Sequence, residues 1–381
     1  MPSAVAPSAL GGFLALVSAH GCVDIAVGIW PIYKTLAGLD LAMAGLVATV
    51  ASMSGNAAQF LFGVAADRGW QRIMLVLGVL LAGCSFWLPL VSGWPMMTAL
   101  LAATFVGSAM FHPAGAGLAG GISAQSKGFF VALFLAGGYA GTAVSQALFS
   151  ATWTMLGSGA VVLFTLPVAC AIGLAWQVQP QPRRDFPPLA ESLVLMSRQW
   201  PHLWVMFVVQ VSSTVTALAV IFLLPDLLLA RKSPTWLVAG GGHAILILGA
   251  CAALVPSGHL ADRLGPRLVL TVANLASGVA LAAFLLLPDI HPLWSMLLLA
   301  TFGFTNAANN PVLVAEGNRL LPGQGAAASA LLMGLPWCLA AMTPLVAGTI
   351  AAHSGAAAGI GWLALSVPVS VAIGLGLRGH R

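Results

Sequence analysis

Residues 63–72 read GVAADRGWQR, and residues 258–267 read GHLADRLGPR. The two stretches share a first Gly, an Asp-Arg pair and a final Arg at the same spacing. A repeat separated by about half the chain indicates two halves built on one plan. The shared positions are Gly63, Asp67, Arg68 and Arg72 in the first copy and Gly258, Asp262, Arg263 and Arg267 in the second.

The composition around this repeat is that of a membrane protein. The chain has 381 residues, of which 60% are hydrophobic and 6% are charged, and its mean hydropathy is +0.99. A soluble domain carries roughly 25% charged residues, so a chain this apolar needs lipid as its solvent. The runs at 73–90 and 268–287 do not alternate between apolar and polar residues, as barrel strands would, and therefore predict helices.

The apolar runs predict an all-α membrane protein with twelve transmembrane helices in two pseudo-symmetric six-helix bundles. The predicted spans cover 10–33, 41–65, 73–92, 96–119, 128–151, 157–177, 203–229, 236–257, 268–287, 293–315, 325–349 and 356–377. The long polar connection lies at the middle of the chain. We therefore expect an N-terminal bundle at 1–178, a cytoplasmic linker at 179–201 and a C-terminal bundle at 202–381.

The basic residues predict the orientation of the helices. With both ends of the chain inside, most Lys and Arg residues face the cytoplasm and only Lys34, Arg231 and Lys232 face outward. This excess of positive charge on one side predicts that both termini are cytoplasmic. The net charge of +5 thus has a topological role, and nucleic acid is not an expected partner.

Further matches connect the two halves. Residues 103–105 return as 300–302, and His112-Pro113 corresponds to Asn310-Pro311. The duplicated loop resembles the signature of the major facilitator superfamily, and the resemblance covers the whole chain. It implies a transporter whose spans 1, 4, 7 and 10 line a central cavity. It also implies that the first loop is a gate, in which Asp67 meets the N-terminus of span 11 and stabilises the outward-open state.

A closer resemblance is to the fosmidomycin-resistance subfamily of drug:proton antiporters. Five stretches carry it, each at the matching place in the chain: 19–24, 111–113, 137–141, 320–323 and 347–353. The subfamily tends to have an acidic residue after His-Pro, where this chain has Ala114, and an Asn before the Asp of span 1, where it has Val23. These departures concern the substrate and not the transporter class.

Few ionisable residues are expected at membrane depth. His20 and Asp24 are four residues apart and share a face of span 1, and His112 lies near the middle of span 4. A charge at this depth is costly and usually functional. Because a histidine beside a carboxylate can exchange a proton near physiological pH, we expect a proton-coupling and substrate-binding cluster. The alternatives are a structural His20–Asp24 pair, and a His112 that only bonds a carbonyl freed by Pro113.

The C-terminal half offers neutral hydrogen-bonding residues instead. When Pro31 is aligned with Pro225, Thr214 takes the place of His20, and Asn309 or Asn310 takes the place of His112. We expect substrate contacts from this half, with packing through side-chain amides as the alternative for the Asn residues. The candidates are Thr214, Asn306, Asn309 and Asn310, with Gln210 beside them and Gln146 in span 5 as a weaker candidate.

Several chemistries are not expected. No Lys or Arg is predicted deep in a span, which argues against multiply charged anions, since these commonly bind a fixed bidentate donor. The chain has no glycine-rich phosphate loop ending in Lys and Ser or Thr, so ATP is not the expected energy source. Neither a catalytic residue nor a cofactor nor a resident metal is expected, and the five cysteines lack metal-ligand spacing.

Three transport functions are left open. The leading one is proton-coupled efflux of a small drug-like or zwitterionic compound by alternating access. The alternatives are proton-coupled uptake of a nutrient, since one fold serves both directions, and transport of a divalent transition metal by His20, Asp24 and His112. The expected partners are a small-molecule substrate, protons and the lipid bilayer, and we expect a monomer in a bacterial inner membrane.

Overall fold

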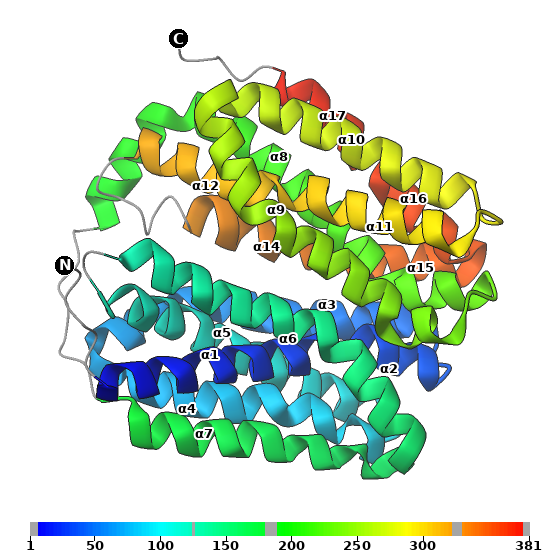
Figure 1. Cartoon of the computed structure of the whole chain (residues 1–381), viewed down its shortest axis with the longest axis horizontal. Coiled ribbons are helices and arrows are strands. Elements are labelled where there is room, and N and C mark those ends of the chain that lie inside the picture. The colour runs from blue at the N-terminus through cyan, green and yellow to red at the C-terminus, as the bar shows by residue number, and fades with distance from the viewer. Residues whose placement is uncertain (1–6, 124–125, 180–188, 322–329, 376–381) are drawn as a thin grey trace. The chain divides into compact units, whose positions relative to one another are not determined.

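The computed structural model describes residues 7–123, 126–179, 189–321 and 330–375 (Figure 1). Every element within these ranges is helical. The contacts divide the chain into two compact units, one of residues 1–37 and 47–185 and the other of residues 38–46 and 186–381.

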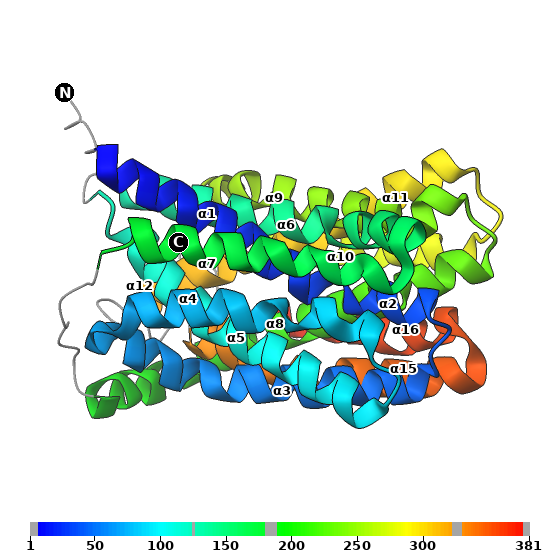
Figure 2. The same ribbon diagram turned by 90° about the horizontal axis from the view of Figure 1, so that it is seen from below.

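The first unit is a bundle in which α1 packs along α6 and α4 packs along α5. The helices α4 and α5 lie side by side in the view from below (Figure 2). Its core is apolar and includes Leu16, Leu75, Phe111 and Phe134. The elements are α1 (Pro7–Gly28), α2 (Trp30–Leu36), α3 (Leu41–Ala65), η1 (Ala66–Trp70), α4 (Gln71–Ala82), η2 (Gly83–Leu90), α5 (Trp94–Gly120), α6 (Lys127–Leu156), η3 (Gly157–Phe164) and α7 (Thr165–Gln177).

In the second unit, α11 packs between α9 and α10, and the long α8 contacts α14, α16 and α17. A core at one end of this unit joins Leu203, Leu270, Leu313 and Leu332. The elements are α8 (Leu189–Ala230), η4 (Leu237–Gly241), α9 (Gly242–Leu264), α10 (Pro266–Leu286), α11 (Pro292–Ala307), α12 (Asn309–Leu320), η5 (Ala330–Gly334), α14 (Leu335–Ala340), α15 (Thr343–Ser354), α16 (Ala356–Ala364) and α17 (Ser366–Gly374).

Ten helical stretches of the described residues are long and apolar enough to cross a membrane. One of them, Phe129–Gln177, is 49 residues long and contains both predicted spans at 128–151 and 157–177. The predicted span at 293–315 is not among the ten. The membrane-helix class is therefore confirmed, and the count of twelve spans stays a prediction.

The span predicted at 293–315 is divided between α11 and α12 at Ala308. Pro311 follows the break and has no backbone N–H to donate to the carbonyl of Ala307, four residues earlier. Ala308 itself keeps helical angles, with a φ of −57° and a ψ of −24°, so α11 and α12 are compatible with one kinked span, and the span at 293–315 stays a prediction.

The second glycine of each repeat has a backbone reason. Gly69 has a φ of +95° and Gly265 a φ of +86°, and each stands where one helix ends and the next begins. A residue with a side chain adopts this left-handed conformation only at a cost. Both copies therefore need a Gly at the turn, although its position shifts by one residue between them.

The predicted linker is only partly a loop. Residues 180–188 lie outside the described part of the chain, whereas 189–201 form the first turns of α8. Pro201 continues this helix and does not start a new one.

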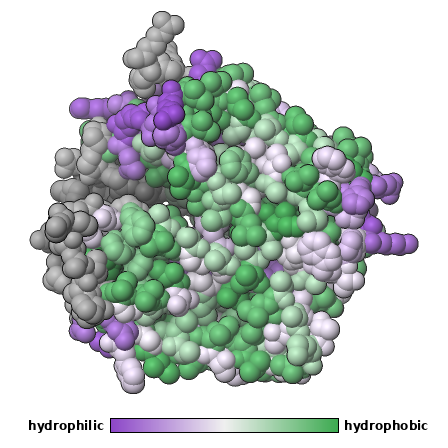
Figure 3. Space-filling view, viewed as in Figure 1, coloured by the Kyte–Doolittle hydropathy of each residue, from purple (hydrophilic) through white to green (hydrophobic). Residues whose placement is uncertain are grey.

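Apolar side chains cover the outside of the helices as well as their cores. Leu61, Trp176 and Val255 are exposed large apolar residues of the kind that lipid covers. In the space-filling view the face is mostly apolar, and hydrophilic side chains gather toward the helix ends at its left and right (Figure 3).

Candidate functional site

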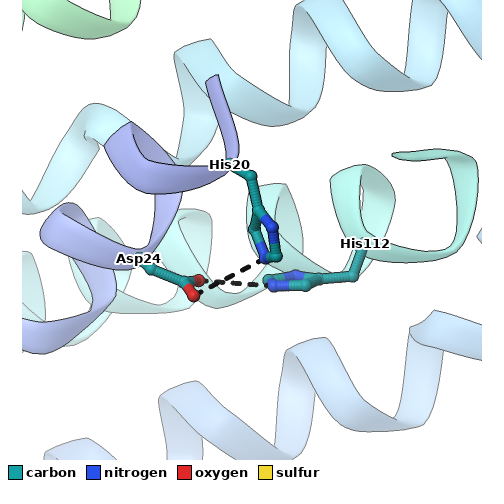
Figure 4. A group of neighbouring side chains, drawn as sticks. All are labelled: His20, Asp24 and His112. Carbon is teal, nitrogen blue, oxygen red and sulfur yellow. Dashed lines mark ion pairs between the residues drawn. The ribbon is translucent and has the colours of Figure 1, made fainter. Parts of the chain in front are cut away.

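Three ionisable side chains meet inside the first unit (Figure 4). His20 and Asp24 come from α1, and His112 comes from α5. His20 Nε2 lies 3.6 Å from Asp24 Oδ2, and His112 Nε2 lies 3.3 Å from Asp24 Oδ1. The side chain of His20 is 3% exposed, that of Asp24 19% and that of His112 32%, so the cluster opens on the side of His112.

His20 is held in place by α6. Its Nδ1 lies 2.6 Å from the carbonyl oxygen of Phe134, and its ring stacks on the Phe134 ring at a centroid distance of 3.9 Å. The ring of His112 meets it edge-on at 4.9 Å. The His20 side chain thus has one orientation, with Nε2 toward Asp24.

His112 is oriented from its own helix. Its Nδ1 lies 2.8 Å from the carbonyl oxygen of Ser108 and 3.1 Å from the Ser108 hydroxyl. Pro113 frees the carbonyl of Ala109, one residue further on, so His112 does not fill the vacancy left by the proline. It contacts both a backbone carbonyl and Asp24.

The hydrogen-bond partners assign the protons of the two rings. A carbonyl oxygen only accepts, so in each histidine Nδ1 carries a proton and Nε2 faces the carboxyl group of Asp24. With Asp24 ionised and both rings neutral, nitrogen lone pairs would face carboxylate oxygens. One further proton, on a ring or on Asp24, converts one of these two contacts into a hydrogen bond.

The helix α6 closes the cluster from a third side. A Cβ atom on Gly138 would lie 2.5 Å from His20 Nε2 and 2.6 Å from Asp24 Oδ2, so only Gly leaves room for the two side chains. One turn later the hydroxyl of Thr142 lies 3.4 Å from Asp24 Oδ2 and 3.1 Å from the carbonyl oxygen of Gly138, so it can donate to either. Thr142 and Phe134 were not predicted from the sequence, although the glycine-rich stretch at 137–141 marked this part of the helix.

The same glycine-rich stretch brings α1 and α6 together. A Cβ atom on Gly141 would overlap the backbone of Gly21. The close approach of the two helices is what places Thr142 beside Asp24.

In the second unit the three predicted Asn residues have different hydrogen-bond partners. Asn309 pairs with Asn274 of α10 in both directions, at 2.8 and 3.3 Å, and both are buried. Asn306 donates to the carbonyl of Ser213 at 3.2 Å. These two contacts are of the packing kind that was the alternative interpretation.

Asn310 lies in a different environment. Its Oδ1 accepts a 2.6 Å hydrogen bond from Gln210 Nε2, which lies 3.4 Å from the hydroxyl of Thr214. Gln210 is 1% exposed, and its Oε1 has no hydrogen-bond partner in the described residues. Gln210, Thr214 and Asn310 therefore form a small group that is separate from the Asn274–Asn309 pair.

Gln146 in α6 is fully buried. Neither Oε1 nor Nε2 of its side chain has a hydrogen-bond partner among the described residues. It lies one turn after Thr142 on the same face of α6.

The two repeat loops make different contacts. Arg72 donates to the carbonyl of Ala175 near the end of α7. Arg68 is exposed. The side chain of Asp67 lies outside the described part of the chain.

In the second copy, which begins at Gly258, Asp262 lies 3.7 Å from Arg319, and Arg319 bonds Glu316 at 2.9 Å. Arg263 and Arg267 are exposed. The acidic residue of this copy thus belongs to an ion-pair network at the end of α12.

One prediction about charge needs correction. Lys34 was assigned to an outer loop, but it lies in the last turn of α2 and is fully buried. The apolar stretch Leu10–Leu36 continues further than the sequence pattern indicated, and it includes this lysine.

Comparisons with known proteins agree on the family. A sequence profile described as Major Facilitator Superfamily matches residues 12–343. No curated protein matches the chain by sequence.

Among solved structures, the chain is similar to two crystal structures of a bacterial homolog to the human lysosomal transporter Spinster. The one in the inward-facing and unoccupied conformation has a TM-score of 0.77 at 14% identity, over 98% of this chain and 97% of that chain. The one in the inward-facing and occupied conformation has a TM-score of 0.74 at 13% identity, over 97% and 95%. At these identities the likeness shows the fold alone. Since the profile covers most of its length, the chain belongs to the major facilitator superfamily and is a secondary transporter that works by alternating access, not an enzyme.

Proposed function

We propose that this protein is a proton-coupled exporter of a small drug-like or zwitterionic compound. The observation that carries the proposal is the cluster of His20, Asp24 and His112, in which two oriented imidazoles face one carboxyl group at membrane depth. An ionisable residue in such a position is a functional site by default. The resemblance to the fosmidomycin-resistance subfamily in five stretches supports the proposal.

The exchange of proton for substrate follows from the charge count. The cluster needs one proton beyond those on the two Nδ1 atoms, and a substrate that binds Asp24 would compete with that proton for the same carboxyl oxygens. Binding of substrate then releases the proton, and rebinding of a proton from the other side releases the substrate. This competition is the simplest scheme for antiport.

The substrate contacts from the second unit are proposed to be neutral. Gln210, Thr214 and Asn310 offer hydrogen-bond donors and acceptors, and the unpaired Oε1 of Gln210 is free to accept from a ligand. Asn306 and Asn309 have their amides engaged within the unit, so we assign them to packing.

The remaining features concern direction, gating and location. The resemblance favours export over uptake, and the gate is proposed to lie at Asp67, Arg68 and Arg72 with its counterpart at Asp262. The proposed location is a bacterial inner membrane with both termini in the cytoplasm, and the proposed functional state is a monomer.

The test begins with a growth screen of an overexpressing strain against a panel of toxic compounds and metal salts. A compound whose toxicity the strain resists is then added to purified protein in weakly buffered detergent while the pH is recorded. We expect proton release on addition. A compound that is exported and bound without any proton release would overturn the coupling.

One observation favours a second candidate, transport of a divalent transition metal. Ligands bound to zinc at about 2.0–2.1 Å in a tetrahedron lie about 3.3–3.4 Å apart. The nitrogen–oxygen distances of 3.3 and 3.6 Å are close to this value, and one ligand atom from each residue lies within 4.8 Å of the others. Each ring also has its Nδ1 on a carbonyl, as metal-binding histidines commonly do.

Cobalt distinguishes the two candidates. If the cluster transports metal, Co²⁺ added to the purified protein gives visible ligand-field absorption bands that His112→Gln removes, and the metal salts in the growth screen identify the cargo. Absence of these bands in the wild-type protein eliminates the metal candidate and leaves the proton candidate intact.

A further inference from the structure

Four residues of α6 follow one another at intervals of four: Gly138, Thr142, Gln146 and Ser150. Residues at this spacing lie on one face of a helix, and each step advances about 6 Å along the axis. The first two members face Asp24, since Gly138 leaves space for its carboxyl group and Thr142 bonds it. We call these four residues the α6 polar stripe.

The outer half of the stripe holds polar atoms without partners. Gln146 is 0% and Ser150 3% exposed, and three of their atoms, Gln146 Oε1, Gln146 Nε2 and Ser150 Oγ, have no hydrogen-bond partner in the described residues. Leaving a buried polar group unpaired costs about 1–3 kcal/mol. Native proteins pair almost all such groups with protein atoms or with ordered water.

Other hydroxyl groups of α6 are satisfied within the helix. Ser145 donates to the carbonyl of Thr142, Thr152 to that of Leu148, and Thr154 to that of Ser150, all at 2.7–2.8 Å. Ser150 differs from them, although the same local bond is open to it. The unpaired atoms are therefore specific to the stripe.

An aromatic group lies beside the outer half of the stripe. Phe149 and Trp153 stack at a centroid distance of 5.9 Å, and the ring of Tyr33 meets both edge-on. The hydroxyl of Tyr33 donates to the carbonyl of Leu88, so it does not serve Gln146 or Ser150. Apolar rings on one side and unpaired polar atoms on the other are what a narrow, one-sided water path needs.

We propose that the α6 polar stripe lines a water-filled path that connects Asp24 with the Leu156 end of α6, the end predicted to face outward. Water molecules would accept from Gln146 Nε2 and donate to Gln146 Oε1 and Ser150 Oγ, and the Thr142 hydroxyl would lie where the path meets the carboxyl group. The role of the path in supplying protons to Asp24 rests on the proposed function. The hydration of Gln146 and Ser150 does not.

Cysteine labelling tests the hydration directly. Ser150→Cys and Ala151→Cys are compared in proteoliposomes treated with a charged, membrane-impermeant methanethiosulfonate reagent, with the five native cysteines replaced by alanine or serine. Ala151 is the matched control, because it is adjacent in sequence but exposed on the outside of the helix, where lipid keeps a thiol protonated and unreactive. We expect labelling at least tenfold faster at 150 than at 151. Equal rates, or a faster rate at 151, would overturn the path.

A second pair guards against misfolding. If the Ser150→Cys protein does not elute as a single species in gel filtration, Gln146→Cys is compared with Ala147→Cys, which is exposed in the same way. The same order of rates is expected.

Proton release separates this proposal from the proposed function. Fast labelling at 150 together with unchanged proton release in Asp24→Asn would leave the water path in place and remove the coupling role of Asp24. Slow labelling at 150 together with lost proton release in Asp24→Asn would remove the water path and leave the coupling role of Asp24 in place.

Discussion

His112 Nε2 lies 3.3 Å from Asp24 Oδ1, so this contact joins α5 to α1 at the carboxyl–imidazole cluster. The same carboxyl group receives the hydroxyl of Thr142 and faces Nε2 of His20. Three side chains from α1, α5 and α6 thus converge on Asp24.

The substitution Asp24→Asn is expected to abolish proton release on substrate addition, because the amide keeps the shape of the protonated acid but cannot ionise. Binding of the substrate should weaken, because in the proposed scheme the substrate contacts the carboxyl oxygens that the proton occupies, so proton release is compared at substrate concentrations that saturate each protein. The measurement is proton release in weakly buffered detergent beside a binding titration with the compound found in the growth screen. The control is Asp40→Asn, an exposed cap of α3. If Asp24→Asn and wild type release the same number of protons, Asp24 is structural.

Gly138→Ala is expected to lower the transport rate by at least tenfold. The added Cβ would lie 2.5 Å from His20 Nε2 and 2.6 Å from Asp24 Oδ2, so the cluster or the helix must shift. Such overpacking typically costs about 1–3 kcal/mol. Transport in proteoliposomes and the melting temperature are both measured. Gly361→Ala is the control, since a Cβ there meets no atom within 4 Å. Wild-type transport by Gly138→Ala would contradict the geometry of the cluster.

Asn309→Leu is expected to destabilise the protein by about 1–3 kcal/mol, because it removes both hydrogen bonds between Asn309 and Asn274 from a buried site. The amide of Asn274 then keeps only the Leu270 carbonyl and the Ser370 hydroxyl. The double substitution Asn274→Leu/Asn309→Leu should recover part of this loss, since removing both partners of a buried pair costs less than removing one. Thermal unfolding in detergent measures both. Thr305→Val, which removes only a bond within its own helix, should change little. Additive effects of the two Leu substitutions would show that the amides do not act as a pair.

Substitutions at Asp262 and Arg319 are expected to affect transport and stability differently. Asp262→Asn should leave the melting temperature nearly unchanged, because the Asp262–Arg319 pair is 69% and 60% exposed and such pairs contribute at most about 1 kcal/mol. Its effect is expected in the transport rate. Arg319→Ala should destabilise the protein as well, because Glu316 is 11% exposed and loses a 2.9 Å partner. Equal melting temperatures for wild type and Arg319→Ala would sink the assignment of Glu316 as a buried, paired carboxylate.

Arg231→Gln is expected to destabilise the second unit by about 1–3 kcal/mol. The guanidinium donates to the last carbonyls of α10, those of Phe284 at 2.8 Å and Leu285 at 2.9 Å, and lies over the Phe284 ring. Burial lowers the pKa of Arg231, and the nearby Asp289 offsets only part of this effect. The arginine still stays charged throughout the physiological range. The neighbouring Lys232→Gln is the control, because Lys232 is exposed. A difference in melting temperature no larger than that of the control would remove the capping role.

Much of the fold could be read from local features of the chain. The low charge content requires lipid, and the repeat at 63–72 and 258–267 marks two related halves, so the membrane-helix class and the superfamily were predicted and are confirmed. The pairing of His20 with Asp24 on one face of α1 also follows from their spacing, since residues four apart on a helix are neighbours.

What the sequence alone could not decide depends on neighbours distant in the chain. Asn309 and Asn310 are adjacent and identical in type, yet one pairs with Asn274 of α10 and the other with Gln210 of α8, because neighbouring residues of α12 point about 100° apart. Which helix stands on each side is decided by the tertiary packing. Lys34 shows the same limit, since its position in the pattern indicated a loop and its surroundings bury it.

The cluster of His20, Asp24 and His112 depends on both local sequence and tertiary packing. Composition and helical period determined that His20, Asp24 and His112 would lie at membrane depth, because these are properties of a residue and its near neighbours. Only the tertiary structure decided that both Nε2 atoms face one carboxyl group and that Gly138 and Thr142 complete the site. Those relationships arise from the close packing of α1, α5 and α6, and that packing depends on contacts between residues more than a hundred positions apart, which no local pattern records.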